Sequence, residues 1–96
     1  RPEHVGAGDT LHGGLAATVL DEAMVWAGIL QERVLSVTGT LNLRFLRPIY
    51  VTDTIEAIGW VEERRGRRLK LSGRLEIGDV VAAEATGLYL ASSTVE

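Results

Sequence analysis

Residues 12–24, HGGLAATVLDEAM, combine residue types that can stabilise a negatively charged oxygen and move a proton. The first backbone N–H groups of a helix lack intrahelical partners, and glycines leave them accessible. The amides of Gly13 and Gly14 are therefore candidates to bind a substrate carbonyl oxygen as its charge develops. Asp21 follows in the apolar run, where a buried, unpaired carboxylate would cost several kcal/mol. We expect Asp21 either to have polar partners or to take part in chemistry.

The spacing within this segment predicts more than one subunit. Gly13 and Asp21 are eight residues apart, a rise of about 12 Å along a helix. One carbonyl group cannot easily meet both from the same helix, so a shared site requires two antiparallel helices from neighbouring subunits. A chain of 96 residues also buries only about 60 to 65% of its unfolded surface, which favours oligomerisation.

The elements that must position these residues are one helix and a run of strands. A helix over 14–31 is predicted because apolar residues recur every three or four positions, at Leu15, Val19, Ala23, Ala27 and Leu30. This helix is apolar nearly all round and needs a partner that wraps it. In the segment that follows, apolar residues alternate with polar ones and Thr38 falls on the polar side. Strands are predicted at 35–45, 53–63, 68–77 and 80–91, with turns at 63–68 and 78–79. This order predicts a single α+β domain, residues 1–96, with an antiparallel sheet curled over the helix.

Composition excludes several classes of protein. The net charge of −3 gives no positive field for nucleic acid or an anionic membrane, and the longest apolar segment carries two carboxylates, so no transmembrane helix is expected. The chain has no cysteine, which is compatible with a reducing compartment and leads us to expect the cytoplasm. His4 and His12 are poorly spaced for a metal, and we expect no metal and no cofactor. Because the chain opens with Arg1 and Pro2, we expect a trimmed sequence whose targeting segment, if any, has been lost.

The segment HGGLAATVLDEAM resembles the signature of the small hotdog-fold acyl-CoA thioesterases, in the phenylacetyl-CoA and mammalian thioesterase-superfamily branch. In that family a histidine and glycine pair is followed, nine residues after the histidine, by an aspartate. The similarity continues through GTLNLRFLRPI, the Gly66-Arg67 turn and AEATGLYLA, and covers nearly the whole chain. It implies a hotdog fold, hydrolysis of an acyl-CoA thioester without cofactor, and a homodimer or dimer of dimers. Relatives usually have another strand, and often a helix, before the position of Arg1. We therefore expect this sequence either to be a fragment or to complete its sheet differently.

The resemblance also implies roles for individual residues. Asp21 would activate the hydrolytic water or attack the thioester itself, and the Gly13 N–H would hold the carbonyl oxygen. His12 would help to position that carbonyl. Thr38 falls where family members often carry a serine or threonine that orients the water or the aspartate. Gly6 departs from the family, since several members have an asparagine or glutamine near this point.

Two further groups have both a structural and a functional interpretation. The segment RRGRRLK, residues 64–70, is typical of a solvated hairpin, but arginines beside a glycine turn also suit the phosphates of CoA. The candidates for CoA contact are Arg65, Arg67, Arg68 and Gly14. Glu22 points about 100° away from Asp21 around the helix, so we expect it at a dimer interface or in solvent. Met24 and Trp26 are expected in the core or the interface, with an acyl tunnel as the alternative for one of them.

Two other functions compete with hydrolysis. A hotdog dehydratase would act on hydroxyacyl thioesters, but its proline-rich loop and helix pattern is absent from this sequence. A non-catalytic acyl-CoA-binding module would hold pantetheine without turnover. The presence of Asp21, His12 and Gly13 favours the enzyme over the binding module, while Gly6 and the missing strand leave the binding module open. The sequence does not identify the acyl group.

Overall fold

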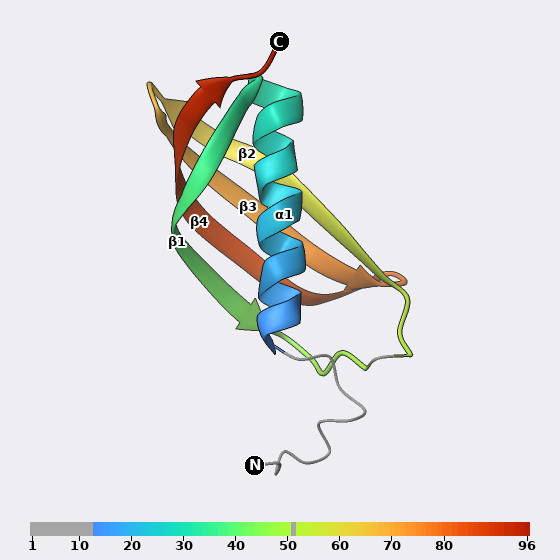
Figure 1. Ribbon diagram of the computed structural model, residues 1–96. Coiled ribbons are helices and arrows are strands. Elements are labelled where there is room, and N and C mark those ends of the chain that lie inside the picture. The colour runs from blue at the N-terminus through green and yellow to red at the C-terminus, as the bar shows by residue number, and fades with distance from the viewer. Residues whose placement is uncertain (1–12, 51) are drawn as a thin grey trace.

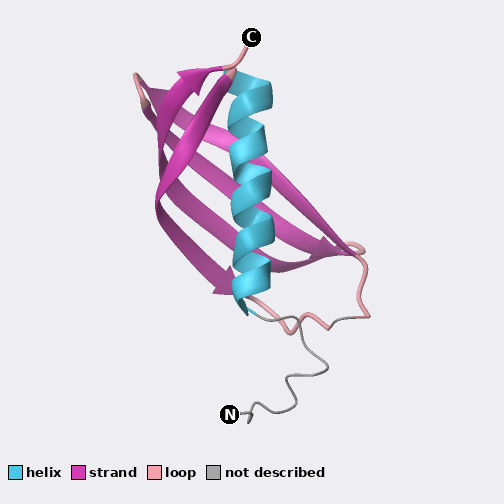
Figure 2. Cartoon of the chain, in the orientation of Figure 1, coloured by secondary structure: helices cyan, strands magenta, loops and turns pink. Residues whose placement is uncertain are grey.

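A computed structural model describes residues 13–50 and 52–96, which form one helix against one antiparallel sheet. Figure 1 shows the helix crossing one face of the curved sheet, and Figure 2 shows that the connecting loops gather at the two ends. The elements are α1 (Gly13–Glu32), β1 (Val34–Phe45), β2 (Ile55–Arg65), β3 (Arg68–Ile77) and β4 (Val80–Thr94). The strand order β1-β4-β3-β2 leaves β1 and β2 at the edges. The predicted α+β class with a sheet curled over the helix is confirmed.

The helix packs on the sheet through a stripe of small and unbranched side chains. Ala16, Leu20, Met24 and Ala27 are all buried and are spaced by three or four residues, as one buried helix face requires. The stripe that predicts the helix lies beside this face, and only Ala27 of that stripe is buried. The helix ends where Arg33 takes a left-handed conformation with φ 58°. Its observed bounds differ by one residue at each end from the prediction. Within the described residues, α1 falls short of the apolarity needed to cross a membrane.

Two glycines let the helix lie very close to the sheet. Gly59 on β2 and Gly73 on β3 stand opposite each other in register. A Cβ atom added at Gly59 would lie 2.5 Å from the Ala23 carbonyl oxygen, and one at Gly73 would lie 3.0 Å from Met24 Cγ. The absence of side chains at these positions therefore determines how close to the sheet the helix segment after Asp21 can lie.

The unbroken alternation predicted for the first strand is wrong. Pairing of β1 with β4 shifts by one residue between Thr38 and Thr40, where Gly39 forms a bulge. An extra residue in one strand reverses which face the following side chains occupy. Before the bulge Ser36 is buried and Val37 is 57% exposed, whereas after it Leu41 and Leu43 pack against the core. Thr38 points to the helix side and not to the polar outer face where the alternation placed it.

The other strands agree with the predictions apart from their ends. The strand expected at 53–63 begins later, at Ile55, because Asp53 closes a turn by accepting a hydrogen bond from the Tyr50 N–H at 2.7 Å. It also continues to Arg65, so that the following turn contains only Gly66, with φ 59°, and Arg67. The strand at 68–77 has the predicted bounds. The last strand runs beyond 91 to Thr94 because it remains paired with the start of β1.

Candidate active site

The carboxylate of Asp21 is held by two hydroxyl groups from the sheet. Asp21 projects from the middle of α1. Its Oδ1 atom accepts a hydrogen bond from Thr38 Oγ1 at 2.7 Å and another from the Tyr89 hydroxyl at 2.5 Å. Thr38 belongs to edge strand β1 and Tyr89 to the neighbouring β4. Three elements therefore meet at one carboxylate oxygen.

Strand register explains why these two hydroxyls converge. Thr38 and Tyr89 are direct cross-strand partners, so their side chains share one face of the sheet. The bulge at Gly39 keeps Thr38 on that face while the strand continues in the opposite phase. Gly87 lies two residues before Tyr89 on the same face, and a Cβ added there would come within 2.7 Å of Tyr89 Cε1. The missing side chain at Gly87 gives the tyrosine ring its room.

The environment keeps Tyr89 in its neutral, proton-donating form. Its side chain is 2% exposed. Burial raises the pKa of the Tyr89 hydroxyl well above its ordinary value, and the hydrogen bond to Asp21 and the charge of that carboxylate raise it further, while Thr38 acts in the opposite direction. The group facing Asp21 is thus a hydrogen-bond donor and not a base.

Sequence reasoning did not single out Tyr89, although a signal for it exists. The neighbouring helix-facing positions of β4 are small residues: Ala83, Ala85, Gly87 and Ala91. A tyrosine in such a row places a buried hydroxyl beneath the helix, and a buried tyrosine hydroxyl usually has a hydrogen-bond partner. The carboxylate inside the apolar helix was the available partner.

The two oxygens of the Asp21 carboxylate differ in their hydrogen bonding. Among the residues that the structure describes, no donor reaches Oδ2. Asp21 is only partly buried, and its neighbour Thr38 is exposed on the free edge of the sheet. The carboxylate therefore has one oxygen held by two donors and one oxygen to which no described residue donates.

The glycines predicted to bind the carbonyl lie at the start of the same helix. Gly13 is the first residue of α1, and the Gly14 carbonyl accepts a hydrogen bond from Thr18 Oγ1 at 2.9 Å. His12 and Gly6 lie outside the described residues. Because Gly13 and Asp21 are separated by about 12 Å along one helix axis, a single chain does not bring these two groups together.

The arginine turn is not assembled around Asp21 within one chain. Arg65 pairs with Glu63 at 2.7 Å, and Arg67 Nε donates to the Ala91 carbonyl at 3.2 Å. Arg65 and Arg68 border a hollow of about 300 Å³. Arg65 and Arg68 are cross-strand partners, and Arg68 adjoins Leu69, which is buried beneath the helix. Both arginines therefore lie on the opposite face of the sheet from Asp21. Contact between these arginines and a substrate at Asp21 stays a prediction that involves a second copy of the chain.

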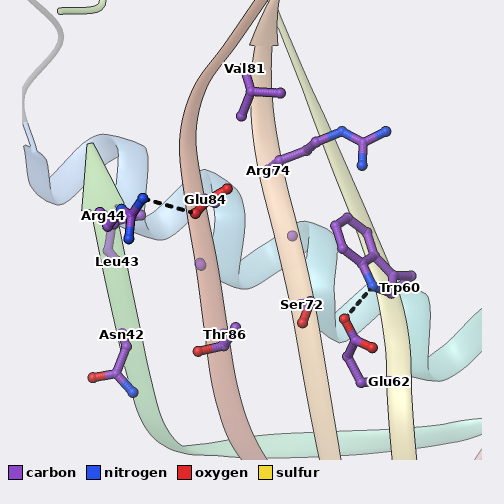
Figure 3. Close-up of a pocket in the computed structure, with 12 residues that line it drawn as sticks. Asn42, Leu43, Arg44, Trp60, Glu62, Ser72, Arg74, Val81, Glu84 and Thr86 are labelled. Atoms are coloured by element: carbon purple, nitrogen blue, oxygen red, sulfur yellow. Dashed lines mark hydrogen bonds and ion pairs between the residues drawn. The ribbon is translucent and has the colours of Figure 1, made fainter. Parts of the chain in front are cut away.

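A larger hollow of about 730 Å³ also lies on the sheet face turned away from α1 (Figure 3). Asp21, Thr38 and Tyr89 do not line it. Its polar side chains pair largely with one another: Trp60 Nε1 donates to Glu62 at 2.7 Å. The hydrogen bond from Trp60 is the main reason that the pKa of the Glu62 carboxyl is lowered. The Asp21 carboxylate and its two hydroxyl donors thus lie apart from this hollow.

The remaining candidates divide between core and surface. Met24 is fully buried, which places it in the core and not in an acyl tunnel of this single chain. Trp26 is 54% exposed and Glu22 is exposed. Among the described residues, no group of three metal-binding side chains comes together.

Solved structures share this fold. The PaaI protein of Escherichia coli, from the phenylacetic acid degradation operon, aligns with a TM-score of 0.84 at 19% identity over 97% of this chain and 67% of that chain. A Streptococcus mutans protein bound to acetyl CoA aligns with a TM-score of 0.86 at 15% identity over 98% of this chain and 76% of that chain. A Bacillus halodurans protein solved with CoA aligns with a TM-score of 0.74 at 24% identity. These likenesses show the hotdog fold, as the sequence resemblance implied.

The alignment to the Bacillus halodurans protein covers 88% of this chain and 58% of that chain, so this chain spans less than two thirds of that relative. Among curated proteins, no sequence matches significantly. The thioesterase superfamily, however, matches residues 8–84. This match spans more than half of the chain. It includes the helix that carries Asp21, the strand that carries Thr38, and most of the rest of the sheet. The chain belongs to the thioesterase superfamily.

Proposed function

We propose that this chain hydrolyses acyl-CoA thioesters to a free acid and CoA. The observation that carries the proposal is the Asp21 carboxylate, which two hydroxyls hold by one oxygen while the other stays open. Membership of the thioesterase superfamily directs this carboxylate to thioester chemistry. Two structures with the same fold were solved with CoA or acetyl CoA, which supports CoA as the leaving group.

In the proposed reaction Asp21 acts as a general base. Its Oδ2 atom takes a proton from water while the water oxygen bonds to the thioester carbonyl carbon. The carbonyl π electrons move to oxygen, where the Gly13 N–H of a neighbouring subunit stabilises the charge. As the carbonyl re-forms, the C–S bond breaks and its electrons leave with sulfur. The proton held by Asp21 passes to the thiolate, so that the products are a carboxylic acid and the CoA thiol.

The site requires a second copy of the chain, and α1 presents a surface for one. Leu15, Trp26 and Leu30 are more than half exposed, and with Val19 they form a stripe at spacings that keep to one side of the helix. An apolar stripe of this kind marks an interaction surface. A second copy of the chain would cover this stripe, whereas Asp21 lies about 150° away around the helix, on the side of edge strand β1. We infer a homodimer, which can pair further into a dimer of dimers.

Sedimentation of the protein at micromolar concentration tests this assembly. The expected result is a dimer or tetramer that Leu30→Glu converts to smaller species, since it places a charge in the apolar stripe. A well-folded monomer with full activity would contradict both the dimer and the shared site.

The hydrolytic role is tested by Asp21→Asn with Glu22→Gln as the matched control. Asparagine retains an oxygen that can accept both hydrogen bonds but loses the base. We expect kcat to fall by roughly 10²- to 10⁴-fold while KM changes little. Glu22 is the adjacent, exposed carboxylate, and its amide variant should retain activity. Thiol release from a panel of acyl-CoAs measures both and also identifies the preferred acyl group.

Three results would change the proposal. Acyl-CoA binding without any thiol release would identify a binding module. Near-parental hydrolysis by Asp21→Asn would exclude Asp21 as the base. A single turnover in ¹⁸O-labelled water that leaves label in Asp21, and not in the acid, would show that Asp21 attacks the carbonyl directly.

A further inference from the structure

We propose that Tyr89 is a positioning residue, whose hydroxyl acts with that of Thr38 to hold Asp21 Oδ1 and so present Oδ2 to the water. This inference rests on the proposed hydrolytic function and adds a residue and an oxygen assignment to it. Tyr89 does not touch the reacting atoms in this account. It acts only through Asp21.

The geometry around the carboxylate supports the assignment. An aspartate carboxyl rotates easily about its last torsion, because that torsion has broad minima. A single donor would leave this rotation partly free. Here donors from two different strands converge on the same oxygen, at 2.7 Å from Thr38 and 2.5 Å from Tyr89. Hydrogen bonds to a charged carboxylate are among the stronger ones in proteins, so together they define the plane of the group.

Tyr89 is itself held in place, which is what a positioning residue requires. Its side chain is buried in the core beneath the helix, and its backbone pairs with Thr38 on one side and with Leu69 on the other. The ring lies against Gly87, where a Cβ would come within 2.7 Å. The hydroxyl therefore cannot follow Asp21 if the helix moves. The raised pKa of Tyr89 keeps the donor proton in place over the working pH range.

Tyr89→Phe tests the proposal because it retains the ring and removes only the donor. We expect kcat to fall by about 10- to 100-fold, in keeping with the loss of a hydrogen bond to a charged group and of alignment. KM should change less than about threefold, since the substrate does not contact the hydroxyl. Tyr50→Phe is the matched control, because Tyr50 is the only other tyrosine in the sequence and is exposed.

A double-mutant cycle separates positioning from stability. If Tyr89 acts through the carboxylate, adding Tyr89→Phe to Asp21→Asn should cause no further loss of kcat. A residue that only stabilises the fold would add its loss in both backgrounds and would lower the fraction of folded protein in both. Additive losses, a rise in KM at constant kcat, or a kcat within twofold of the parent would each overturn the inference.

A spectroscopic measurement keeps the proposal testable if Tyr89→Phe fails to fold. Incorporation of 3-fluorotyrosine labels both tyrosines, and Tyr50→Phe assigns the two ¹⁹F signals. Asp21→Asn should shift the Tyr89 signal and leave that of Tyr50 in place, and an unchanged Tyr89 signal would overturn the inference. The proposed function is refuted by a different result, namely hydrolysis at the parental rate by Asp21→Asn. If Asp21→Asn is inactive and Tyr89→Phe retains the parental kcat, only the role of Tyr89 is refuted.

Discussion

Substitution of Gly59 by alanine tests how closely α1 must lie on the sheet for Asp21 to be held. The new Cβ would lie 2.5 Å from the Ala23 carbonyl oxygen and 2.8 Å from the Ala23 carbonyl carbon. Ordinary van der Waals contact begins near 3.4 Å, so the two backbones must separate by roughly 0.9 Å. No side-chain rotation relieves this clash, because the atoms on both sides belong to the backbone or to a rigid Cβ.

The size of the effect follows from this displacement. Forcing an extra methyl into a well-packed core costs about 1–3 kcal/mol, and each kcal/mol lowers the Tm of a domain of this size by about 4–8 °C. Asp21 is two residues before Ala23 on the same helix, and its hydrogen bonds to Thr38 and Tyr89 are 2.7 and 2.5 Å long. A shift of nearly 1 Å would stretch or break them. We expect kcat to fall by about 100-fold, as misplacement of a catalytic group on this scale does.

The matched control makes the same change inside the helix. A Cβ at Gly28 would meet the Val34 carbonyl oxygen at 3.6 Å and Leu69 Cδ2 at 3.7 Å, which are ordinary contacts. Alanine is also favoured over glycine inside a helix by up to about 1 kcal/mol. Urea denaturation and thiol release should therefore show a stable, active Gly28→Ala and a destabilised, slow Gly59→Ala. Equal behaviour of the two variants, or full activity in Gly59→Ala, would refute the reasoning.

The remaining predictions concern the two hydroxyls and the arginine turn. Thr38→Val keeps the branched shape and removes one hydrogen-bond donor to Asp21, so kcat in the thiol-release assay should fall about tenfold. Thr40→Val, on the other face of β1, should leave kcat unchanged, and similar effects at both positions would contradict the register. Because the pKa of Tyr89 in the folded state is raised above its ordinary value near 10, the folded chain keeps a proton that the unfolded chain releases. The contribution of Tyr89 to the free energy of unfolding should therefore be complete below about pH 10 and decrease above it, by at most ~1.4 kcal/mol per pH unit for this one group. Urea denaturation should show a shallower decrease with pH in Tyr89→Phe than in the parent, and equal slopes would exclude the linkage. Arg65→Ala should raise KM for acyl-CoA but not for a pantetheine thioester without the nucleotide, and the difference should shrink with salt; equal losses on both substrates would mean that the turn acts through folding.

Local patterns in the sequence determined the elements and singled out the Asp21 carboxylate. The three- and four-residue spacing from Leu15 to Leu30 predicts α1 to within a residue at each end, because helix periodicity depends only on near neighbours. Alternating leucines predict β3 with its observed bounds for the same reason. Asp21 is conspicuous in the sequence alone, since a charge in an apolar helix needs a partner or a function.

Only the tertiary structure decided what surrounds that carboxylate. The bulge at Gly39 turns Thr38 towards the helix, and a two-residue period carries no information about where a strand gains an extra residue. Tyr89 reaches Asp21 from 68 positions further along the chain, because β4 inserts between β1 and β3. Sheet order and register arise from long-range pairing and from how deeply the helix packs. For that reason the sequence alone indicated the proposed base, while the fold was needed to identify the hydroxyls that hold its carboxylate.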